Sequence, residues 1–329
     1  MRAPNYWHRK TPGAKAFTAL LSPLAAAYGL GVKFSRKHKK TFQPRANIVC
    51  VGNLTLGGAG KTPIAIALAE YFLEHGAKVM FLSRGYQGRL AGPVGVELTF
   101  HCAADVGDEP LLLARTAPTI VSRDRAAGAK MADSLGADIV IMDDGHQNFS
   151  LKKDFSFVVI DAATRFGNGR LFPAGPLREP LAEGLARADA IIIFGNEKLP
   201  LPEFTGPILR ANLVPKGDSE LTGKKCVLFA GIGRPEKFFD TVSKMGGQIC
   251  ATQSFSDHHH YSESDIRKLR ASAVELNASL VTTEKDFVRI ASHLRDNILT
   301  VPVRVLFKDK KLLHKLLDKL TKSAGKSAT

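Results

Sequence analysis

The stretch ANIVCVGNLTLGGAGKTP, which runs from Ala46 to Pro63, decides the organisation of this chain. Ile48 to Val51 form a short β-branched run that predicts a buried strand, and apolar periodicity predicts a helix from Lys61 to Glu74. A glycine-rich loop lies between the two. Glycines let backbone N–H groups turn toward a polyanion, and the start of a helix adds partial positive charge. The order of strand, loop, Lys-Thr and helix therefore predicts a phosphate-binding loop.

Each position of this loop has an expected role. Lys61 is expected to reach the β- and γ-phosphates of a nucleotide, and Thr62 to hold Mg²⁺ through its hydroxyl. The predicted nucleotide-binding residues are Thr55, Gly57, Gly58, Ala59, Gly60, Lys61 and Thr62. Thr55 stands where the usual pattern begins with glycine. The alternative is a glycine-rich turn that binds nothing, and it is disfavoured because strand, loop, Lys-Thr pair and helix are all in register.

The composition limits the class of protein. A chain of 329 residues suggests two domains, and 44% hydrophobic with 23% charged residues is ordinary for a globular protein. The net charge of +15 points to an anionic partner, such as nucleic acid, a phosphorylated substrate or an acidic membrane surface. The four cysteines form no CxxC pair, which fits a reducing cytosol and argues against a disulfide scaffold or a cysteine zinc site.

The segment before the loop, residues 1–45, combines basic clusters with an uncharged span from Ala16 to Val32. The apolar residues at helical spacing are Phe17, Leu20, Leu21, Leu24 and Tyr28, and Ser22-Pro23 can start a second helix. A transmembrane helix needs ~20 apolar residues, and this span is shorter and interrupted by proline and glycine. We therefore expect an interfacial helix in the cytoplasmic leaflet, held by its basic flanks. The alternative is that this face packs on the protein's own core.

Strand and helix patterns alternate along the rest of the chain. The strands expected first are Lys78–Leu82, Thr119–Ser122, Asp138–Met142, Ser156–Asp161 and Ala190–Phe194, with a helix at Arg123–Leu135. Polar, glycine-rich composition from Pro215 to Lys225 marks a domain boundary. The strands expected beyond it are Cys226–Ala230, Gln248–Phe255, Ser279–Thr282 and Ile298–Phe307, and the helices are Pro235–Met245, Ser262–Leu276 and Lys310–Leu320. The predicted units are residues 1–45, a domain over 46–215 and a smaller domain over 216–329.

Two acidic motifs are candidates for chemistry. Asp143 and Asp144 follow the apolar strand Asp138–Met142. A carboxylate at such a strand end supplies the second Mg²⁺ contact beside a phosphate-binding loop, directly or through water. Two Asp residues ending a buried strand are costly unless a cation or hydrogen-bond donors meet them. Asp108, in the motif GDEP, is either a helix N-cap or a functional carboxylate, and its local sequence favours the cap.

A proline-rich loop and a histidine run supply further candidates. The loop PAGPLREP, Pro173 to Pro180, is rigid and could present Arg178 and Glu179 toward the cleft, although a solvated ion pair is the alternative. In the run His258–His260, consecutive side chains of an extended chain point to alternate faces, so at most two could share a metal. A single histidine acting as acid, base or orienting partner is therefore favoured.

Several motifs occur in one order along the chain: GNLTLGGAGKTP, SRGY, GDEP, DDGHQN, PAGPLREP, FSDHHHYS and TTEKD. Together they closely resemble the tetraacyldisaccharide 4'-kinase family, and the resemblance covers nearly the whole chain. It implies an α/β fold: a P-loop NTPase-type, largely parallel sheet with helices on both faces, a smaller α/β domain across a cleft, and an N-terminal amphipathic helix. It also implies phosphorylation of the 4'-hydroxyl of a tetraacyl glucosamine disaccharide 1-phosphate by ATP with Mg²⁺, giving lipid IVA in lipid A biosynthesis.

The resemblance assigns roles by position. Lys61 and Thr62 match the family's triphosphate and Mg²⁺ contacts, and threonine at position 55 is in keeping with the family. The positions that match its acidic, metal-associated residues are Asp143, Asp144 and Glu179.

The resemblance also changes the interpretation of Asp108, which matches the family's proposed catalytic base, whereas His258 matches the histidine that pairs with it. Because the two lie in different predicted domains, closure over the substrate would assemble the pair and exclude water. The implied partners are the lipid A precursor and the inner-membrane surface, where the protein would be peripheral on the cytoplasmic face.

Two other function classes are weighed against this one. A phosphate-loop kinase of a soluble metabolite would use the N-terminal helix only to cap its core. A nucleotide-gated protein that binds nucleic acid would lose affinity steeply with salt, but the sequence contains no recognised nucleic-acid motif. We therefore expect no nucleic-acid partner, and no stable protein partner is inferred.

Overall fold

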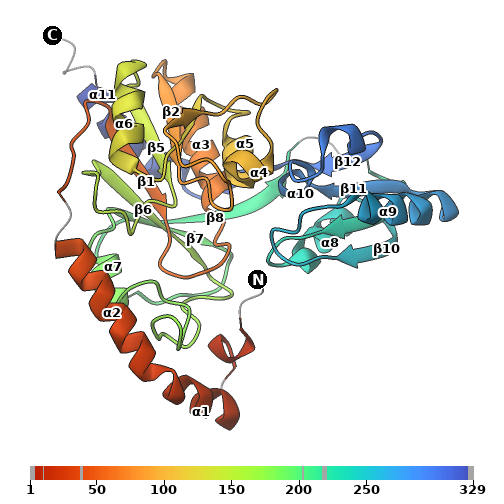
Figure 1. The fold of residues 1–329 in the computed structure, drawn as a ribbon, viewed down its shortest axis with the longest axis horizontal. Helices are drawn as coiled ribbons and strands as arrows, with labels where there is room; N and C mark the ends of the chain where they lie inside the picture. Colours follow the sequence, from red (N-terminus) through yellow and green to blue (C-terminus); the bar gives the residue numbers. More distant parts are fainter. Residues whose placement is uncertain (1–3, 10, 38–39, 202–203, 217–220, 325–329) are drawn as a thin grey trace.

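Two β-sheets organise the chain (Figure 1). The computed structural model describes residues 4–9, 11–37, 40–201, 204–216 and 221–324. The larger sheet has nine strands and the smaller sheet has four.

The larger sheet carries the glycine-rich loop near its centre. Its strand order is β13-β8-β7-β6-β1-β5-β2-β4-β3, and its neighbours are parallel except at the two edges, where β3 and β13 are antiparallel. The strands are β1 (Asn47–Gly52), β2 (Val79–Ser83), β3 (Val94–Gly95), β4 (Thr119–Val121), β5 (Ile139–Asp143), β6 (Phe155–Asp161), β7 (Ala190–Phe194), β8 (Ile208–Pro215) and β13 (Val303–Phe307). Because parallel strands end at the same edge, the loop after β1 meets the carboxyl end of β5.

Helices cover both faces of this sheet. On one face, α3 (Lys61–Glu74) and α11 (Lys310–Ala324) share a core with alternate strand residues such as Val49. On the opposite face, α6 (Arg125–Ser134) packs against the other strand residues, including Ile48. The short helices near the loop edge are α4 (Ala103–Val106), α5 (Asp108–Leu113) and α7 (Leu181–Leu185). The predicted fold, a largely parallel sheet with helices on both faces, is confirmed.

The smaller sheet is parallel throughout, in the order β10-β9-β11-β12. Its strands are β9 (Lys225–Ala230), β10 (Gln248–Ser254), β11 (Ser279–Thr283) and β12 (Ile298–Val301). Alternate residues of β9 serve two separate cores: Phe229 joins Ile266 of α9 (Glu263–Glu275), and Leu228 joins Phe238 of α8 (Pro235–Lys244). The short helices α10 (Glu284–Phe287) and η2 (Ser292–Leu294) follow β11.

The chain crosses back to the larger sheet at Pro302. The sequence analysis predicted one strand over Ile298–Phe307, and this is wrong: β12 pairs within the smaller sheet, whereas β13 pairs with β8 in the larger one. Proline has no N–H to donate and a fixed φ, so it ends the first strand and permits the change of sheet. Residues 303–324, predicted to lie in the smaller domain, therefore lie with the larger sheet. Strands β3 and β8 were not predicted.

The N-terminal segment forms η1 (Asn5–Trp7), α1 (Pro12–Leu20) and α2 (Ser22–Lys37), so a second helix begins at Ser22 as predicted. Trp7 is buried, and its Nε1 donates to the carbonyl of Pro173 at 3.2 Å. The ring of Tyr28 packs edge-on against Phe172. This segment is therefore fastened to the loop that leads into PAGPLREP.

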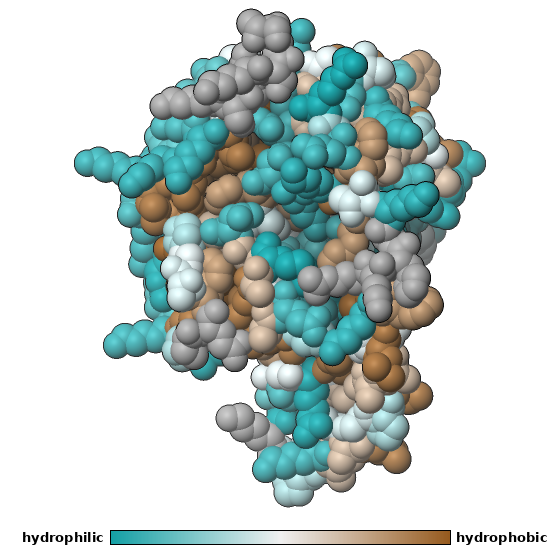
Figure 2. All heavy atoms as spheres, turned by 90° about the vertical axis from the view of Figure 1, so that its left-hand side faces the viewer, coloured by the Kyte–Doolittle hydropathy of each residue, from teal (hydrophilic) through white to brown (hydrophobic). Residues whose placement is uncertain are grey.

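Part of the predicted apolar face does not pack on the core. Leu20 and Leu24 are 72% and 60% exposed. Figure 2 shows apolar surface in the projecting lower part of the molecule, where α1 lies. Within the described residues no single helix has the length and apolar character to span a membrane, and α1 and α2 meet those criteria only as a pair bent by 50°.

Candidate active site

The glycine-rich loop makes a tight turn into α3. Gly60 is the N-cap with a φ of +83°, and a Cβ there would lie 2.5 Å from the Phe194 ring. Gly57 has a φ of +109°. Both conformations favour glycine, because L side chains rarely adopt them. The turn places Lys61 and Thr62 in the first turn of α3, the geometry that favours an anion.

Polar contacts hold the side chain of Lys61. Its Nζ lies 3.3 Å from Oδ1 of Asn53 and 3.6 Å from Oδ1 of Asp144. The buried Asn53 also donates from Nδ2 to the carbonyl of Thr55 at 2.8 Å. Asn53 therefore ties the first half of the loop to its lysine, a function that the sequence analysis did not assign.

The PAGPLREP loop supports the glycine-rich loop from the side. The N–H of Leu56 donates to the carbonyl of Pro176 at 2.8 Å. Arg178 donates from Nε to the carbonyl of Thr55 at 3.1 Å and from Nη1 to Oδ1 of Asp144 at 2.8 Å. The loop thus presents Arg178 to the acidic pair, and the alternative of a solvated Arg178–Glu179 pair is wrong.

Asp143, at the end of β5, has one satisfied and one unsatisfied oxygen. Its Oδ2 accepts a hydrogen bond from the Thr62 hydroxyl at 3.1 Å. Its Oδ1 is buried and has no hydrogen-bond partner among the described residues. Burial, together with the nearby charge of Glu109, raises the pKa of Asp143 to about 7. An unpartnered buried carboxylate oxygen is costly, so the site is suited to a cation.

Asp144 is in a different electrostatic state. Burial works to raise its pKa, but Lys61 and Arg178 outweigh that effect and lower the pKa to about 2. Its backbone φ is +53°. The two adjacent carboxylates therefore make different contacts. Asp144 pairs with Lys61 and Arg178, whereas Asp143 accepts a hydrogen bond from Thr62.

The residues present fit Mg²⁺ at Thr62 and Asp143, because hydroxyl and carboxylate oxygens are the ligands it prefers and it keeps several waters. No group of three His, Cys, Asp or Glu side chains among the described residues could hold a metal by itself. The buried Glu179 accepts hydrogen bonds from Arg187 and from Gln147, at 2.5 and 2.9 Å. Its metal-associated role stays a prediction.

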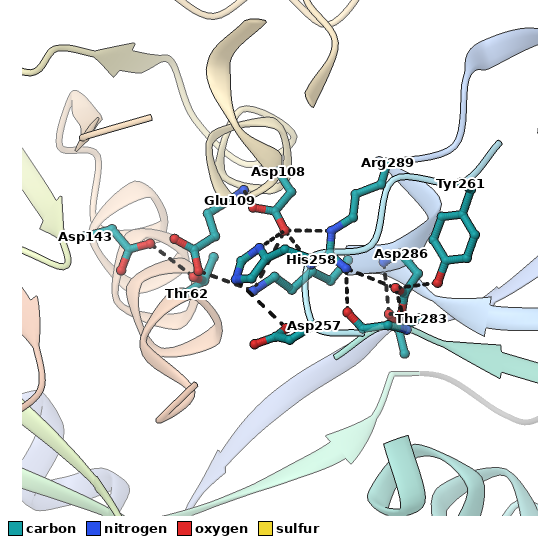
Figure 3. A network of polar contacts seen from close by, with 12 residues as sticks. Thr62, Asp108, Glu109, Asp143, Asp257, His258, Tyr261, Thr283, Asp286 and Arg289 are labelled. Atoms are coloured by element: carbon teal, nitrogen blue, oxygen red, sulfur yellow. Dashed lines mark hydrogen bonds and ion pairs between the residues drawn. The ribbon is translucent and has the colours of Figure 1, made fainter. Parts of the chain in front are cut away.

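A second acidic centre lies where the two sheets meet (Figure 3). Asp108 is the first residue of α5, and Gly107 is the N-cap, so the interpretation of Asp108 as a cap is wrong. Nδ1 of His258, which follows β10, donates to its Oδ2 at 3.0 Å. Arg289 donates from Nε to the same oxygen at 2.8 Å. The structure thus brings together the two residues that the resemblance pairs.

Comparison with known proteins decides the family. A family profile described as Tetraacyldisaccharide-1-P 4'-kinase matches residues 17–322. The tetraacyldisaccharide 4'-kinase of Paramagnetospirillum magneticum is 46% identical over 325 residues, 97% of this chain and 99% of the relative. The enzyme of the same name from Rhodospirillum rubrum is 45% identical over 328 residues, with 97% and 98% covered.

The chain belongs to the tetraacyldisaccharide 4'-kinase family. It is a kinase of lipid A biosynthesis. Its fold is similar to the crystal structure of LpxK from Aquifex aeolicus in complex with ATP, with a TM-score of 0.77 and 26% identity over 92% of this chain and 99% of that one.

Sequence reasoning missed two members of this kinase's second acidic centre. Lys285 lies with Nζ 3.8 Å from Oδ2 of Asp108 and 3.4 Å from Oε1 of Glu109. Arg289 is the other. Lys285 lies in the motif TTEKD, but Arg289 lies beyond it and beyond the end of α10. Their target could not be identified, because it lies more than 170 positions away in the sequence.

The other histidines of the motifs have structural roles. His146 is buried, with Nδ1 3.0 Å from Oγ of Ser156 and Nε2 2.9 Å from the carbonyl of Gly184. Burial lowers its pKa to about 4, so it is neutral at physiological pH. His259 contacts Asp265 and stacks on Phe255. Neither of these two residues contacts Asp108, whereas His258 does.

Proposed function

We propose that this kinase transfers the γ-phosphoryl group of ATP to the 4'-hydroxyl of a tetraacyl glucosamine disaccharide 1-phosphate, giving lipid IVA. The observation that carries the proposal is a buried oxygen of Asp143 that has no hydrogen-bond partner in the described part of the chain. It lies beside Thr62, at the start of the helix that follows the glycine-rich loop. This is the arrangement that a metal–triphosphate complex requires. The structural relative from Aquifex aeolicus was crystallised with ATP.

In this proposal Thr62 and Asp143 hold Mg²⁺, and Lys61 reaches the β- and γ-phosphates. The ion supplies neutralisation of phosphate charge when it is bound. Lys61 is prepared for its role because Asn53 and Asp144 already orient its ammonium group. Backbone N–H groups of the loop are expected to contact the triphosphate without a further cost of ordering.

Asp108 acts as the base toward the sugar hydroxyl, and His258 fixes its orientation. The side-chain contacts to Asp108 all reach Oδ2. In this proposal Oδ1, which accepts the backbone N–H of Glu109 at 3.0 Å, is the oxygen that meets the acceptor. Phosphoryl transfer has a loose transition state, so positioning contributes more than proton abstraction does. A carboxylate with a pKa well below its usual range is therefore sufficient. The groups that lower this pKa against the effect of burial are His258, Lys285 and Arg289.

The exposed apolar residues of α1 and α2 dock the protein on the cytoplasmic face of the inner membrane, where the acylated substrate lies. Leu20 and Leu24 would enter the interfacial layer, and the basic residues that flank the uncharged span would contact anionic headgroups. The protein is peripheral in this proposal.

The deciding experiment incubates purified protein with labelled ATP and tetraacyl disaccharide 1-phosphate in mixed micelles, and omits each component in turn. We expect label on the lipid only when enzyme, Mg²⁺ and both substrates are present. Transfer to water-soluble sugars at a comparable rate would instead support the soluble-metabolite kinase, and no transfer to either acceptor would contradict the proposal.

Membrane docking has its own test. The double variant Leu20→Ser/Leu24→Ser should sediment less with vesicles that contain anionic lipid, yet phosphorylate micelle-dispersed substrate at the parent rate. The matched control is Leu135→Ser/Leu98→Ser, which changes two exposed leucines outside the N-terminal helices. Equal sedimentation of both variants would contradict the docking surface.

A further inference from the structure

The guanidinium of Arg289 joins the two halves of the molecule at the catalytic carboxylate. Its side chain is 1% exposed and comes from the chain just after α10. Nε donates to Oδ2 of Asp108 at 2.8 Å, and Nη2 contacts the same oxygen. Nη1 turns the other way, to the carbonyl of Gly231 at 2.7 Å and Oδ1 of Asp286 at 3.1 Å. All three nitrogens are thus used: two contact Asp108 of α5, and the third contacts Gly231 after β9 and Asp286 of α10.

The anchor on the smaller sheet is itself rigid. Asp286 is fully buried, and its Oδ1 accepts hydrogen bonds from the Tyr261 hydroxyl and the N–H of Gly231, each at 2.8 Å. Its Oδ2 accepts from the Thr283 hydroxyl at 2.6 Å. Figure 3 shows Arg289 between this cluster and Asp108. A side chain held at one end by so many contacts presents its other end at a fixed position.

The contacts divide the two oxygens of Asp108. Oδ2 receives His258 and Arg289, with Lys285 Nζ at 3.8 Å. Oδ1 accepts the backbone N–H of Glu109 at 3.0 Å, a bond within the first turn of α5. The side chains of the smaller sheet therefore fix one oxygen and leave the other directed away from them.

We propose that Arg289 is the positioning residue for Asp108, holding Oδ2 so that Oδ1 meets the acceptor hydroxyl. This inference rests on the proposed role of Asp108 as the base. It adds that the smaller sheet contributes two side chains to the orientation of the base: the imidazole of His258 and the forked guanidinium of Arg289. Two nitrogens of a guanidinium that is itself fixed by buried contacts restrict rotation of the carboxylate more than a single hydrogen bond does.

The charged groups around Asp108 keep its carboxyl ionised. The charged and titratable groups that face it are His258, Lys285, Arg289 and Glu109, with Asp286 behind Arg289. Burial works to raise the pKa of Asp108, and the His258 bond, Lys285 and Arg289 together lower it well below its usual range. Without Arg289 burial would be less opposed, and the pKa would rise.

The test measures kcat and the affinity for ATP of Arg289→Met and Arg289→Lys in the full-length protein at pH 8, each alone and combined with Asp108→Asn. Arg289→Met removes both the charge and the fork, so kcat should fall while the affinity for ATP stays that of the parent. Arg289→Lys keeps the charge but not the fork, so its kcat should fall as well. If Arg289 acts through Asp108, either substitution should lower kcat further by little once Asp108→Asn is present, because residues that act as a unit are not additive.

The control is Arg270→Met. Arg270 also lies on the smaller sheet's side and binds backbone carbonyls, those of Leu294 and Asp296, but is not among the groups that contact Asp108. It should leave kcat unchanged, and unfolding temperatures and ATP affinity are compared for all variants.

Parent kcat in Arg289→Lys, or losses at position 289 that multiply with the loss in Asp108→Asn, would overturn the positioning role. If Arg289→Met does not fold, Arg289→Lys alone still decides by its kcat. Activity retained in Asp108→Asn would show instead that the proposed base is wrong, and this outcome is read independently of any change at position 289.

Discussion

The two acidic centres of this kinase, at Asp143 and at Asp108, differ in their hydrogen-bond partners and in the direction of their pKa shifts. Asp143 has a buried oxygen with no partner among the described residues and a pKa raised to about 7 by burial, with Glu109 adding to the effect. Asp108 is equally well buried, yet His258, Lys285 and Arg289 surround it and hold its pKa well below the usual range. Lys61 is near Asp143 and opposes the rise of its pKa, but the basic side chains of that centre contact Asp144, whereas at Asp108 the chain supplies three basic groups to one carboxylate.

The difference shows where each carboxylate obtains the positive charge that balances it. At Asp143 the effect of Lys61 does not offset burial, so a further cation must come from outside, which is expected of a site that binds a cation together with a triphosphate. At Asp108 the charge comes from the other sheet, so that carboxylate is complete only when the two halves are together. Glu109 lies between the centres, since it pairs with Lys285 and also raises the pKa of Asp143.

The largest expected effect tests the completed centre. Asp108→Asn should lower kcat by about 10²–10⁴-fold, the usual contribution of a positioned acid or base. His258→Gln should lower it less, and the double variant should lose less than the product of the two effects, because the residues act as one unit. Steady-state kinetics of the four proteins measures this. Multiplicative losses would mean that the two residues act separately.

The next effect tests the incomplete centre. Lys61→Ala removes the ammonium group expected at the transferred phosphate, and kcat should fall by about 10²–10³-fold. Lys78, an exposed lysine just before β2 and beyond the far end of α3, is a suitable control as Lys78→Ala. Near-normal turnover in Lys61→Ala would remove the basis for a phosphate-binding loop.

A smaller effect concerns the affinity for Mg²⁺. Binding requires the Asp143 carboxylate, whose pKa is about 7, so binding should release a proton below that pH. The apparent affinity should rise by about tenfold per pH unit up to pH 7 and level off above it. Calorimetry with Mg²⁺ alone between pH 5.5 and 8.5 measures this. An affinity independent of pH would show that Asp143 is ionised without the metal.

The smallest effect is on stability without metal. The pKa of Asp143 is raised from 3.8 to about 7 in the folded protein. The protonated carboxyl therefore contributes stability that is fully present below the unfolded pKa of 3.8 and is lost as pH rises through the folded pKa of about 7. Asp143→Asn should therefore raise the unfolding temperature, relative to the parent, more at pH 8 than at pH 5. Asp144→Asn is the matched opposite: its pKa is lowered to about 2, so the substitution should destabilise equally at both pH values. The same sign for both variants would contradict the contrast between these carboxylates.

Local patterns predicted the elements well where one segment determines its own structure. The helix Lys61–Glu74 and the strand Ala190–Phe194 have the predicted bounds, because an apolar run between turn residues is sufficient information. The single strand predicted over residues 298–307 was wrong because periodicity shows that a segment is extended, not which sheet it joins. The division between sheets depends on contacts that no local window contains.

The site shows the same limit. The closeness of Thr62 and Asp143 follows from parallel topology, since both come at the carboxyl edge of neighbouring strands. The pairing of Asp108 with His258 was available only from the resemblance to a family. Arg289 was not identified, because nothing in its own segment indicates that a buried arginine needs a carboxylate from a distant helix.

The return of the chain at Pro302 has a consequence for how the halves can move. The chain leaves the larger sheet after Pro215 and re-enters it at Val303, and these two residues are paired across the β8–β13 ladder. The N–H of Lys216 donates to the carbonyl of Pro302 at 2.8 Å, so the outgoing and incoming segments are bonded to each other. Two connections at one place form a single hinge region, so we expect relative motion of the halves to be a rotation about it. Because His258 and Arg289 belong to the same half, such a rotation would bring both to Asp108 together.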